Sequence, residues 1–346
     1  MILHSSILRI QAVAVFFTWI LSLLIPSTIS IVISGLLFCI TLIAIFQSNW
    51  HFTKRDILLL ILLALFALQL LPAVMVSTKA LRIWYIFLPS CLIVLVNRNA
   101  LRELILKDNR LQYFFLAGSI LLVVRAFPAI TLDRLNWESA IGLNVISVSR
   151  YSLILLLLLQ PNLLDKKSRI SVYLLLALLS FLFLSTQTRG LIIPLVISFT
   201  MVGIKRIGLI RTVLLAAPIL FFLFEFMSHR LSELEHLETV GRVVNVQEGI
   251  NLFVRNPIFG IGPDMWPKLF SSPYPHNIII ECLVELGLLG SLFILYTYIK
   301  FINIYIREIQ LSRLEILTFC MLFDSLFSGN ISMNILPMLL VVLCMK

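Results

Sequence analysis

Uninterrupted apolar runs recur along the whole chain and constrain its fold more than any other feature. Most runs extend for about 15–20 residues, the length that a helix needs to cross a hydrocarbon core roughly 30 Å thick. Only helices and closed barrels satisfy their backbone groups in lipid, and these runs lack the apolar–polar alternation of barrel strands. Hydrophobic residues make up 60% of the 346 positions and charged residues 13%, well below the roughly 25% charged residues of soluble proteins. The sequence therefore predicts an all-α integral membrane protein.

Twelve such runs predict a polytopic bundle of about 12 transmembrane helices and a single membrane domain over residues 1–346. Their bounds are 8–25, 28–46, 57–75, 80–96, 111–128, 145–160, 170–185, 190–204, 208–226, 276–300, 314–328 and 331–345. No small-residue cleavage site follows the first run, so we expect an uncleaved helix rather than a signal peptide. The five cysteines form no CxxC pair, which is typical of small buried residues rather than of disulfides or a zinc site.

Basic residues gather in alternate connections and predict the orientation of the chain. Most of the 27 lie on one side, at Arg9, Lys346 and the connections near 54–55, 98–110, 166–169, 205–211 and 300–313. The positive-inside rule makes this side cytoplasmic, together with both termini. Because the bias explains most of the net charge of +10, that charge does not indicate nucleic-acid binding.

The longest polar stretch, residues 227–275, is then predicted to lie on the outer face. It contains charges of both signs, an amphipathic segment over Val243–Phe253, turns at Asn256–Pro257 and Gly262–Pro263, and an interfacial Trp266. Loops longer than about 15 residues are usually functional or disordered. This composition favours an ordered outer-face cap within the membrane domain.

Arginines on the predicted outer side are not explained by the orientation rule. Arg150 begins a span, Arg189 lies between two spans, and Arg242 and Arg255 lie in the long loop. Because the guanidinium fork matches phosphate oxygens, arginines that face one cavity would bind a phosphate group. For each arginine two other interpretations stay open: a side chain that extends to the membrane interface, or an ion pair with a carboxylate.

A second informative stretch follows the long loop. Pro275 suits the first position of a helix and places His276 in the first turn, where the helix dipole disfavours an imidazolium. His276 is therefore expected to be neutral and able to accept a proton, or else to form only helix-terminal hydrogen bonds. Glu281 and Glu285 share one helix face towards the bundle interior, either in the site, as we also expect for Asn277, or in ion pairs with arginines.

Glycines downstream and upstream of this stretch are expected to serve the backbone. Gly287, Gly290 and Ser291 would permit close helix packing, and Gly260–Gly262 would form a turn.

The sequence contains no HExxH motif, no Walker A motif and no glycine-rich dinucleotide loop. It therefore predicts neither a metal site nor a cofactor.

Taken in order, these motifs resemble the signature of the O-antigen ligase and polymerase superfamily. Three elements carry most of the resemblance: Asn256–Pro263 as an NPxxGxG turn, Pro275–Asn277 as an HN pair that opens a helix, and Glu285–Gly290 as ELGxxG. Three shorter ones are Thr186–Gly190, which is similar to S-x-[ST]-R-G, Gly241–Arg242 as the GR of an outer-loop helix, and Ser328–Asn330 as SG[DN]. The resemblance covers about residues 140–335.

The resemblance implies a metal-independent glycosyltransferase of the bacterial inner membrane that acts on the outer face. Its donor would be an oligosaccharide linked to undecaprenyl diphosphate, its acceptor the hydroxyl of another glycan, and a chain-length regulator is a candidate partner. Arg189 and Arg242 would hold the diphosphate, and His276 would activate the acceptor hydroxyl. We assign to substrate binding the residues Arg150, Arg255, Asn277, Glu281 and Glu285.

The sequence is consistent with three functions. The first prediction is a polymerase of O-antigen, capsule or exopolysaccharide, because the long loop is short for a ligase and the Ser328–Asn330 element is typical of polymerases. No basic residue follows in Ile331–Pro337, which argues against a phosphate contact there. The alternatives are an O-antigen ligase that transfers glycan to lipid A-core, and a lipid-linked sugar transporter or flippase. Transporters usually show inverted repeats or paired broken helices, and the sequence reveals neither.

Overall fold

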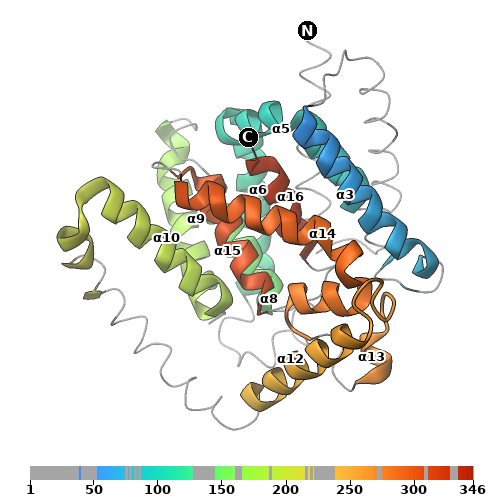
Figure 1. The fold of residues 1–346 in the computed structure, drawn as a ribbon. Coiled ribbons are helices and arrows are strands. Elements are labelled where there is room, and N and C mark those ends of the chain that lie inside the picture. The colour runs from blue at the N-terminus through green and yellow to red at the C-terminus, as the bar shows by residue number, and fades with distance from the viewer. Residues whose placement is uncertain are drawn as a thin grey trace.

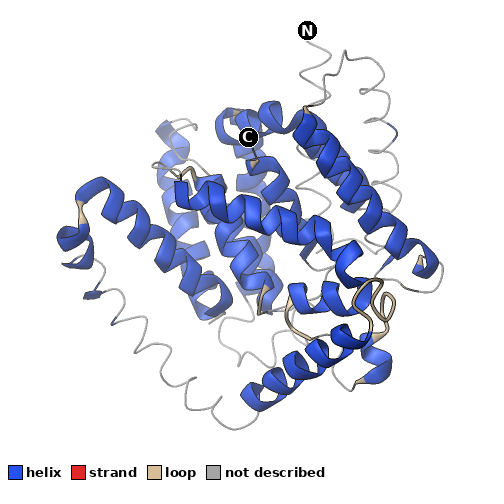
Figure 2. Cartoon of the chain, viewed as in Figure 1, coloured by secondary structure: helices blue, strands red, loops and turns tan. Residues whose placement is uncertain are grey.

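The computed structural model describes a helical bundle with an additional helical layer at one end (Figure 1). The residues that it describes are 39, 53–74, 77, 80–81, 84, 87–127, 145–159, 166–186, 189–214, 217–218, 221, 238–270, 275–307, 311–327 and 334–345. Within these residues the regular structure is entirely helical (Figure 2), which confirms the all-α prediction. Apart from residue 39, the first two predicted spans lie outside the described residues.

Most helices coincide with predicted spans. Their bounds are α3 Lys54–Leu70 with the 3-10 turn η1 Leu71–Ala73, α5 Leu88–Lys107, α6 Asn109–Ala126, α8 Val145–Leu158, α9 Lys166–Ser185, α10 Arg189–Ile207, α12 Glu238–Arg255, α13 Trp266–Leu269, α14 Ile278–Arg307, α15 Arg313–Ser325 and α16 Ile335–Cys344. Helix α5 differs, because it extends into the predicted connection 97–110 as far as Lys107. Leu101 and Ile105, one turn apart, are buried there, so the connection is amphipathic at the helical period.

Among the residues that the structure describes, two helical stretches are long and apolar enough to cross a membrane alone, Lys54–Ala73 and Ile278–Arg307. Shorter apolar helices cover Leu111–Ala126, Val148–Leu158, Val172–Leu184 and Leu191–Ile204. Large apolar side chains such as Leu68, Val124 and Ile210 are exposed on the bundle surface, as expected where lipid replaces water. These features indicate an integral membrane protein, whereas the number of twelve spans stays a prediction.

One end of the bundle is tied together by ion pairs, and we call it the inner end after the predicted orientation. Arg98 and Arg102 lie one turn apart on α5. Arg98 bonds Asp56 at the start of α3 over 2.9 Å, and Arg102 bonds Glu315 at the start of α15 over 2.7 Å. Each of these carboxylates also belongs to a capping box at its helix start. Arg98 and Arg102, which the positive-inside rule assigns to the cytoplasmic side, therefore also hold the starts of α3 and α15 in place.

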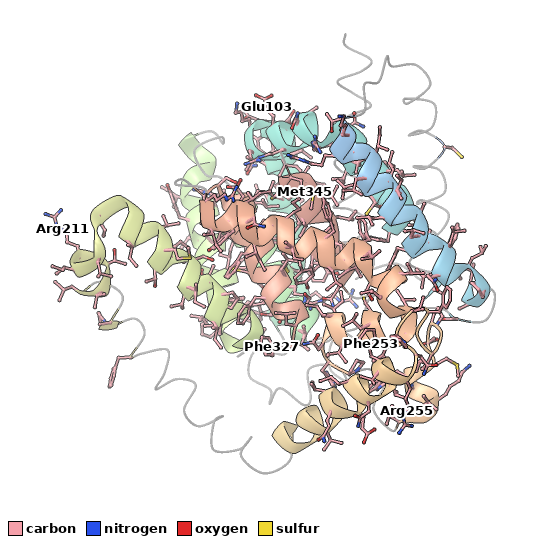
Figure 3. The ribbon with its side chains drawn as sticks, viewed as in Figure 1. Glu103, Arg211, Phe253, Arg255, Phe327 and Met345 are labelled. Atoms are coloured by element: carbon pink, nitrogen blue, oxygen red, sulfur yellow. The ribbon has the colours of Figure 1, made fainter. Side chains whose placement is uncertain are left out.

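The opposite end, which we call the outer end, contains α12 and α13. Helix α14 packs against α3 and α16 across the bundle, and its first residues pack against α12. Figure 1 shows the starts of α10 and α14 and the whole of α12 at this end. Figure 3 shows Glu103 and Arg255 at opposite ends of the molecule.

Candidate functional site

Helix α14 is broken at Gly287, close to the outer end. This residue has φ 63° and ψ −169°, a backbone conformation that is essentially restricted to glycine. The break separates an outer half-helix, residues 278–286, from a longer inner part, residues 288–307. The span predicted over 276–300 coincides with α14, but the sequence did not predict the break. Gly287 permits the close approach of a loop rather than of another helix. Gly290 does pack closely, since a Cβ there would lie 3.2 Å from Gln69 Cγ of α3.

The segment Asn256–Gly262, which we call the clamp loop, fills the break with its backbone. Four backbone hydrogen bonds join it to both sides of the break: Ile261 N to Val284 O (2.8 Å), Gly262 N to Glu285 O (3.0 Å), Leu288 N to Pro257 O (2.8 Å) and Leu289 N to Ile258 O (3.3 Å). A broken helix leaves carbonyl and N–H groups without intrahelical partners, which is costly near lipid. The clamp loop supplies those partners, whereas the sequence predicted only a turn.

Two glycines allow the clamp loop and the break to approach this closely. Gly260 has φ 72°, and a Cβ on it would lie 2.5 Å from the carbonyl carbon of Glu285. A Cβ on Gly287 would lie 2.5 Å from the amide nitrogen of Gly260 and would also clash with Ile258 O. Because the opposing atoms belong to backbone, they cannot rotate away as a side chain could. Glycine is therefore required at both positions by space as well as by conformation.

The outer half-helix begins with a side-chain cap. Asn277 Oδ1 accepts hydrogen bonds from the backbone N–H groups of Ile279 (3.0 Å) and Ile280 (3.1 Å). The helix consequently starts at Ile278, and the predictions that Pro275 is its first residue and His276 lies in its first turn are wrong. Asparagine is among the preferred N-cap residues, and here it prevails over the preference of proline for the first turn.

His276 lies immediately before this cap in an unusual backbone conformation. Its φ is 59° and its side chain is half-buried. Residues other than glycine rarely adopt the left-handed region. Such outliers persist only where the surrounding structure fixes them, and they cluster at functional sites. This geometry makes His276 the best candidate for a reactive group at the outer end.

Helix α12 covers the side of the outer half-helix. A Cβ on Gly249 of α12 would lie 2.5 Å from Ile280 Cγ2, which shows how closely the two helices approach. Trp266 is fully buried, with its ring 4.4 Å from that of Phe270, and its predicted place at the membrane interface stays a prediction. Ser77 Oγ, beyond α3, donates to Asp264 Oδ2 over 2.8 Å. The amphipathic segment predicted over Val243–Phe253 lies within α12, Glu238–Arg255, which is amphipathic.

The other predicted site residues are distributed over the outer end. Glu281 and Glu285 are buried on the outer half-helix, before the break rather than in the inner part of α14. Arg255 ends α12 and its side chain is exposed (Figure 3). Arg189 is the first residue of α10 and Arg242 lies within α12, but only their backbone positions belong to the described part of the chain.

Arg150 lies inside the bundle in an ion pair. It is 4% exposed on α8, its Nε donates to Asp324 Oδ2 of α15 over 2.6 Å, and its Nη2 donates to Asn334 Oδ1 over 3.0 Å. Tyr298 of α14 hydrogen-bonds to the neighbouring Ser325. Of the interpretations that the sequence left open for Arg150, the ion pair is observed. Sequence reasoning missed Asp324, although a carboxylate in an apolar helix signals a buried partner.

Residues 174–295 match the family described as O-antigen ligase. No curated protein matches the chain. The matched segment runs from α9 into α14 and contains Arg189, Arg242, the clamp loop and the outer half-helix with His276, whereas Arg150 and Asp324 lie outside it. The match indicates a membrane enzyme of the kind that transfers lipid-linked glycans, as a polymerase or a ligase. Through this segment the resemblance to the O-antigen ligase and polymerase superfamily is confirmed.

Proposed function

We propose that this protein is a polysaccharide polymerase that transfers glycan from an undecaprenyl diphosphate donor to an acceptor sugar hydroxyl. The observation that carries the proposal is the position of His276. Its backbone is held in a left-handed conformation next to the capped start of the outer half-helix, inside the segment that matches the family. The outer end would face away from the cytoplasm, with both termini inside and residues 227–275 outside.

In the proposed reaction, the acceptor hydroxyl attacks the anomeric carbon of the donor as the bond from that carbon to the diphosphate oxygen breaks. The hydroxyl proton passes to the imidazole of His276, which acts as a general base. Arg189 and Arg242 stabilise the charge that develops on the leaving diphosphate. A single displacement of this kind inverts the anomeric centre. No metal or nucleotide sugar takes part in the proposed reaction.

The start of α14 supports the assignment of the phosphate groups to arginines. Asn277 already accepts from two N–H groups of the first turn, so fewer of them face an incoming anion. Arg150 is engaged with Asp324, so the proposed reaction does not include it among the substrate-binding residues. Glu281, Glu285 and Arg255 remain our candidates for contacts with the acceptor glycan.

A ligase is the second candidate, because the matched family is described by that activity. The transporter alternative gains one feature from the structure, since α14 is a broken helix. However, the backbone groups at this break bond to the clamp loop, whereas transporters use such groups to hold their cargo. The break therefore favours a fixed scaffold over a transport site.

Glycan length on the carrier lipid distinguishes the two transfer reactions. Cells that lack the protein should accumulate single repeat units on undecaprenyl diphosphate if it is a polymerase, and long unligated chains if it is a ligase. Complementation with wild type should restore the normal glycan, whereas His276→Asn should not. Normal glycan in the deletion strain would contradict both functions.

A further inference from the structure

The outer half-helix is fixed at both ends and along one side. The Asn277 cap holds its start, the clamp loop holds its end, and Gly249 of α12 lies against Ile280 in its middle. A strained residue such as His276 keeps its conformation only where neighbouring structure imposes it. The three contacts together provide that constraint.

We infer that Gly260 and Gly287 are positioning residues, whose backbone contact sets the orientation of the outer half-helix and thereby places the imidazole of His276. The inference rests on the proposed function, because it concerns the residue that would accept the proton. Neither glycine would touch a substrate. They act by making a break that can be closed only by another stretch of backbone.

Replacing Gly287 by alanine would show what the contact between Gly260 and Gly287 prevents, namely a continuous α14. Alanine favours the helical conformation more than any other residue, so Gly287→Ala would favour a continuous helix through position 287. A continuous helix would redirect residues 278–286 and expel the clamp loop, because Pro257 O and Ile258 O would lose their N–H partners on Leu288 and Leu289. His276 would then move away from the remainder of the site.

Cys282 provides a native reporter of this movement. It lies on the outer half-helix and is 1% exposed, so a maleimide should modify it slowly while the half-helix is docked. A background in which Ala replaces the other four cysteines, Cys39, Cys91, Cys320 and Cys344, leaves a single reactive thiol. Labelling then reports the position of the half-helix independently of activity.

The experiment compares Gly260→Ala and Gly287→Ala with Gly208→Ala in this background. Gly208 also has a positive φ, 85°, but a Cβ there would meet nothing within 4 Å, so it controls for backbone strain alone. In purified protein we expect labelling of Cys282 to accelerate about tenfold or more in the two test variants, as local opening becomes easier. We expect kcat to fall about 10²-fold, the cost of misplacing a reacting group. Binding of undecaprenyl diphosphate should persist, and Gly208→Ala should resemble wild type.

Two outcomes would overturn the inference: a folded Gly260→Ala with wild-type labelling, or accelerated labelling with an unchanged kcat. If Gly260→Ala and Gly287→Ala do not accumulate in the cell, Gly249→Ala can displace the outer half-helix from its side instead. This variant should be milder, because its Cβ meets the side chain of Ile280 rather than backbone. His276→Asn, measured in parallel, separates this inference from the proposed function. Wild-type turnover in His276→Asn would contradict the catalytic role, while labelling of Cys282 would still test the clamp.

Discussion

The guanidinium of Arg150 lies 2.6 Å from Asp324 Oδ2 in the interior of the bundle, where both side chains are almost completely buried. Asn334 accepts from the same guanidinium, so α8, α15 and the residue that precedes α16 share one polar contact. Removal of water from two charges offsets much of their attraction, but loss of one partner leaves the other charge buried alone. The pair therefore makes the outer ends of these helices interdependent.

Arg150→Met or Asp324→Leu alone should lower the free energy of unfolding by about 3–5 kcal/mol, because each leaves one buried charge without its partner. The double variant should recover most of that loss. Thermal unfolding of the purified variants measures the effect. If Asp324→Leu were as stable as wild type, the pair would have no structural role. A double variant that is stable but inactive would instead support the predicted role of Arg150 in substrate binding.

His276→Asn should reduce turnover by about 10²-fold or more, because asparagine cannot accept a proton as an imidazole does. Asparagine tolerates the left-handed backbone better than most residues, so the variant should keep its fold. A reconstituted assay with lipid-linked donor gives the rate, and His276→Gly controls for the backbone. Turnover close to wild type in both would show that the imidazole is dispensable.

Asn277→Ala should destabilise the outer half-helix by about 1 kcal/mol, the usual cost of losing an N-cap. Asn277→Asp should keep the cap, because a carboxylate oxygen can accept from the same N–H groups of Ile279 and Ile280. Hydrogen exchange of the first turn of α14 measures the effect. Severe loss of activity in Asn277→Asp with normal exchange would instead point to a direct contact between Asn277 and the substrate.

Arg189→Lys should abolish most activity while the protein still accumulates in the membrane. Lysine keeps the charge but lacks the fork that binds two phosphate oxygens at once. The matched control is Arg211→Lys, since Arg211 is exposed and lies far from α12 (Figure 3). Glycan chain length in complemented cells provides the measurement. Normal chains from Arg189→Ala would remove this residue from the site.

The predicted orientation can be tested with one exposed residue from each end, Arg255 and Glu103. In a protein with Cys39→Ala, an impermeant thiol reagent added to the outer face of intact inner membranes should label Arg255→Cys but not Glu103→Cys. Glu103 is exposed and pairs with Lys107, one turn away on the surface, so its replacement should not disturb the fold. Labelling of Glu103→Cys from the outer face would contradict the predicted orientation.

The sequence was sufficient to predict features that depend on local periodicity. The apolar runs predicted helices such as α6, α8 and α15, and the amphipathic segment of the long loop predicted α12, because side-chain burial repeats with the helical turn. The same reasoning extended α14 across Gly287 and placed His276 in its first turn. Helix propensity and proline preference are local, whereas the break depends on a clamp loop that approaches from about 27 residues earlier in the chain.

The sequence also could not identify which residues interact across the bundle. Trp266 was expected at the membrane interface because tryptophan is common there, but the sequence did not predict that it is fully buried beside Gly249 of α12. Arg150 could be recognised as a charge that needs a partner, yet nothing local identifies Asp324 among the other carboxylates. In each case the deciding interaction joins residues that are distant in sequence.

The contact between Gly260 and Gly287 has a consequence for how this part of the chain can vary in evolution. Two side chains in contact can exchange volume, so one substitution can compensate for another and the pair covaries. Here a Cβ at either position meets backbone atoms of the opposite segment, which every amino acid possesses. No substitution at one glycine can make room for a side chain at the other. Among related sequences we therefore expect these two positions, although in contact, to be nearly invariant and to carry no covariation signal.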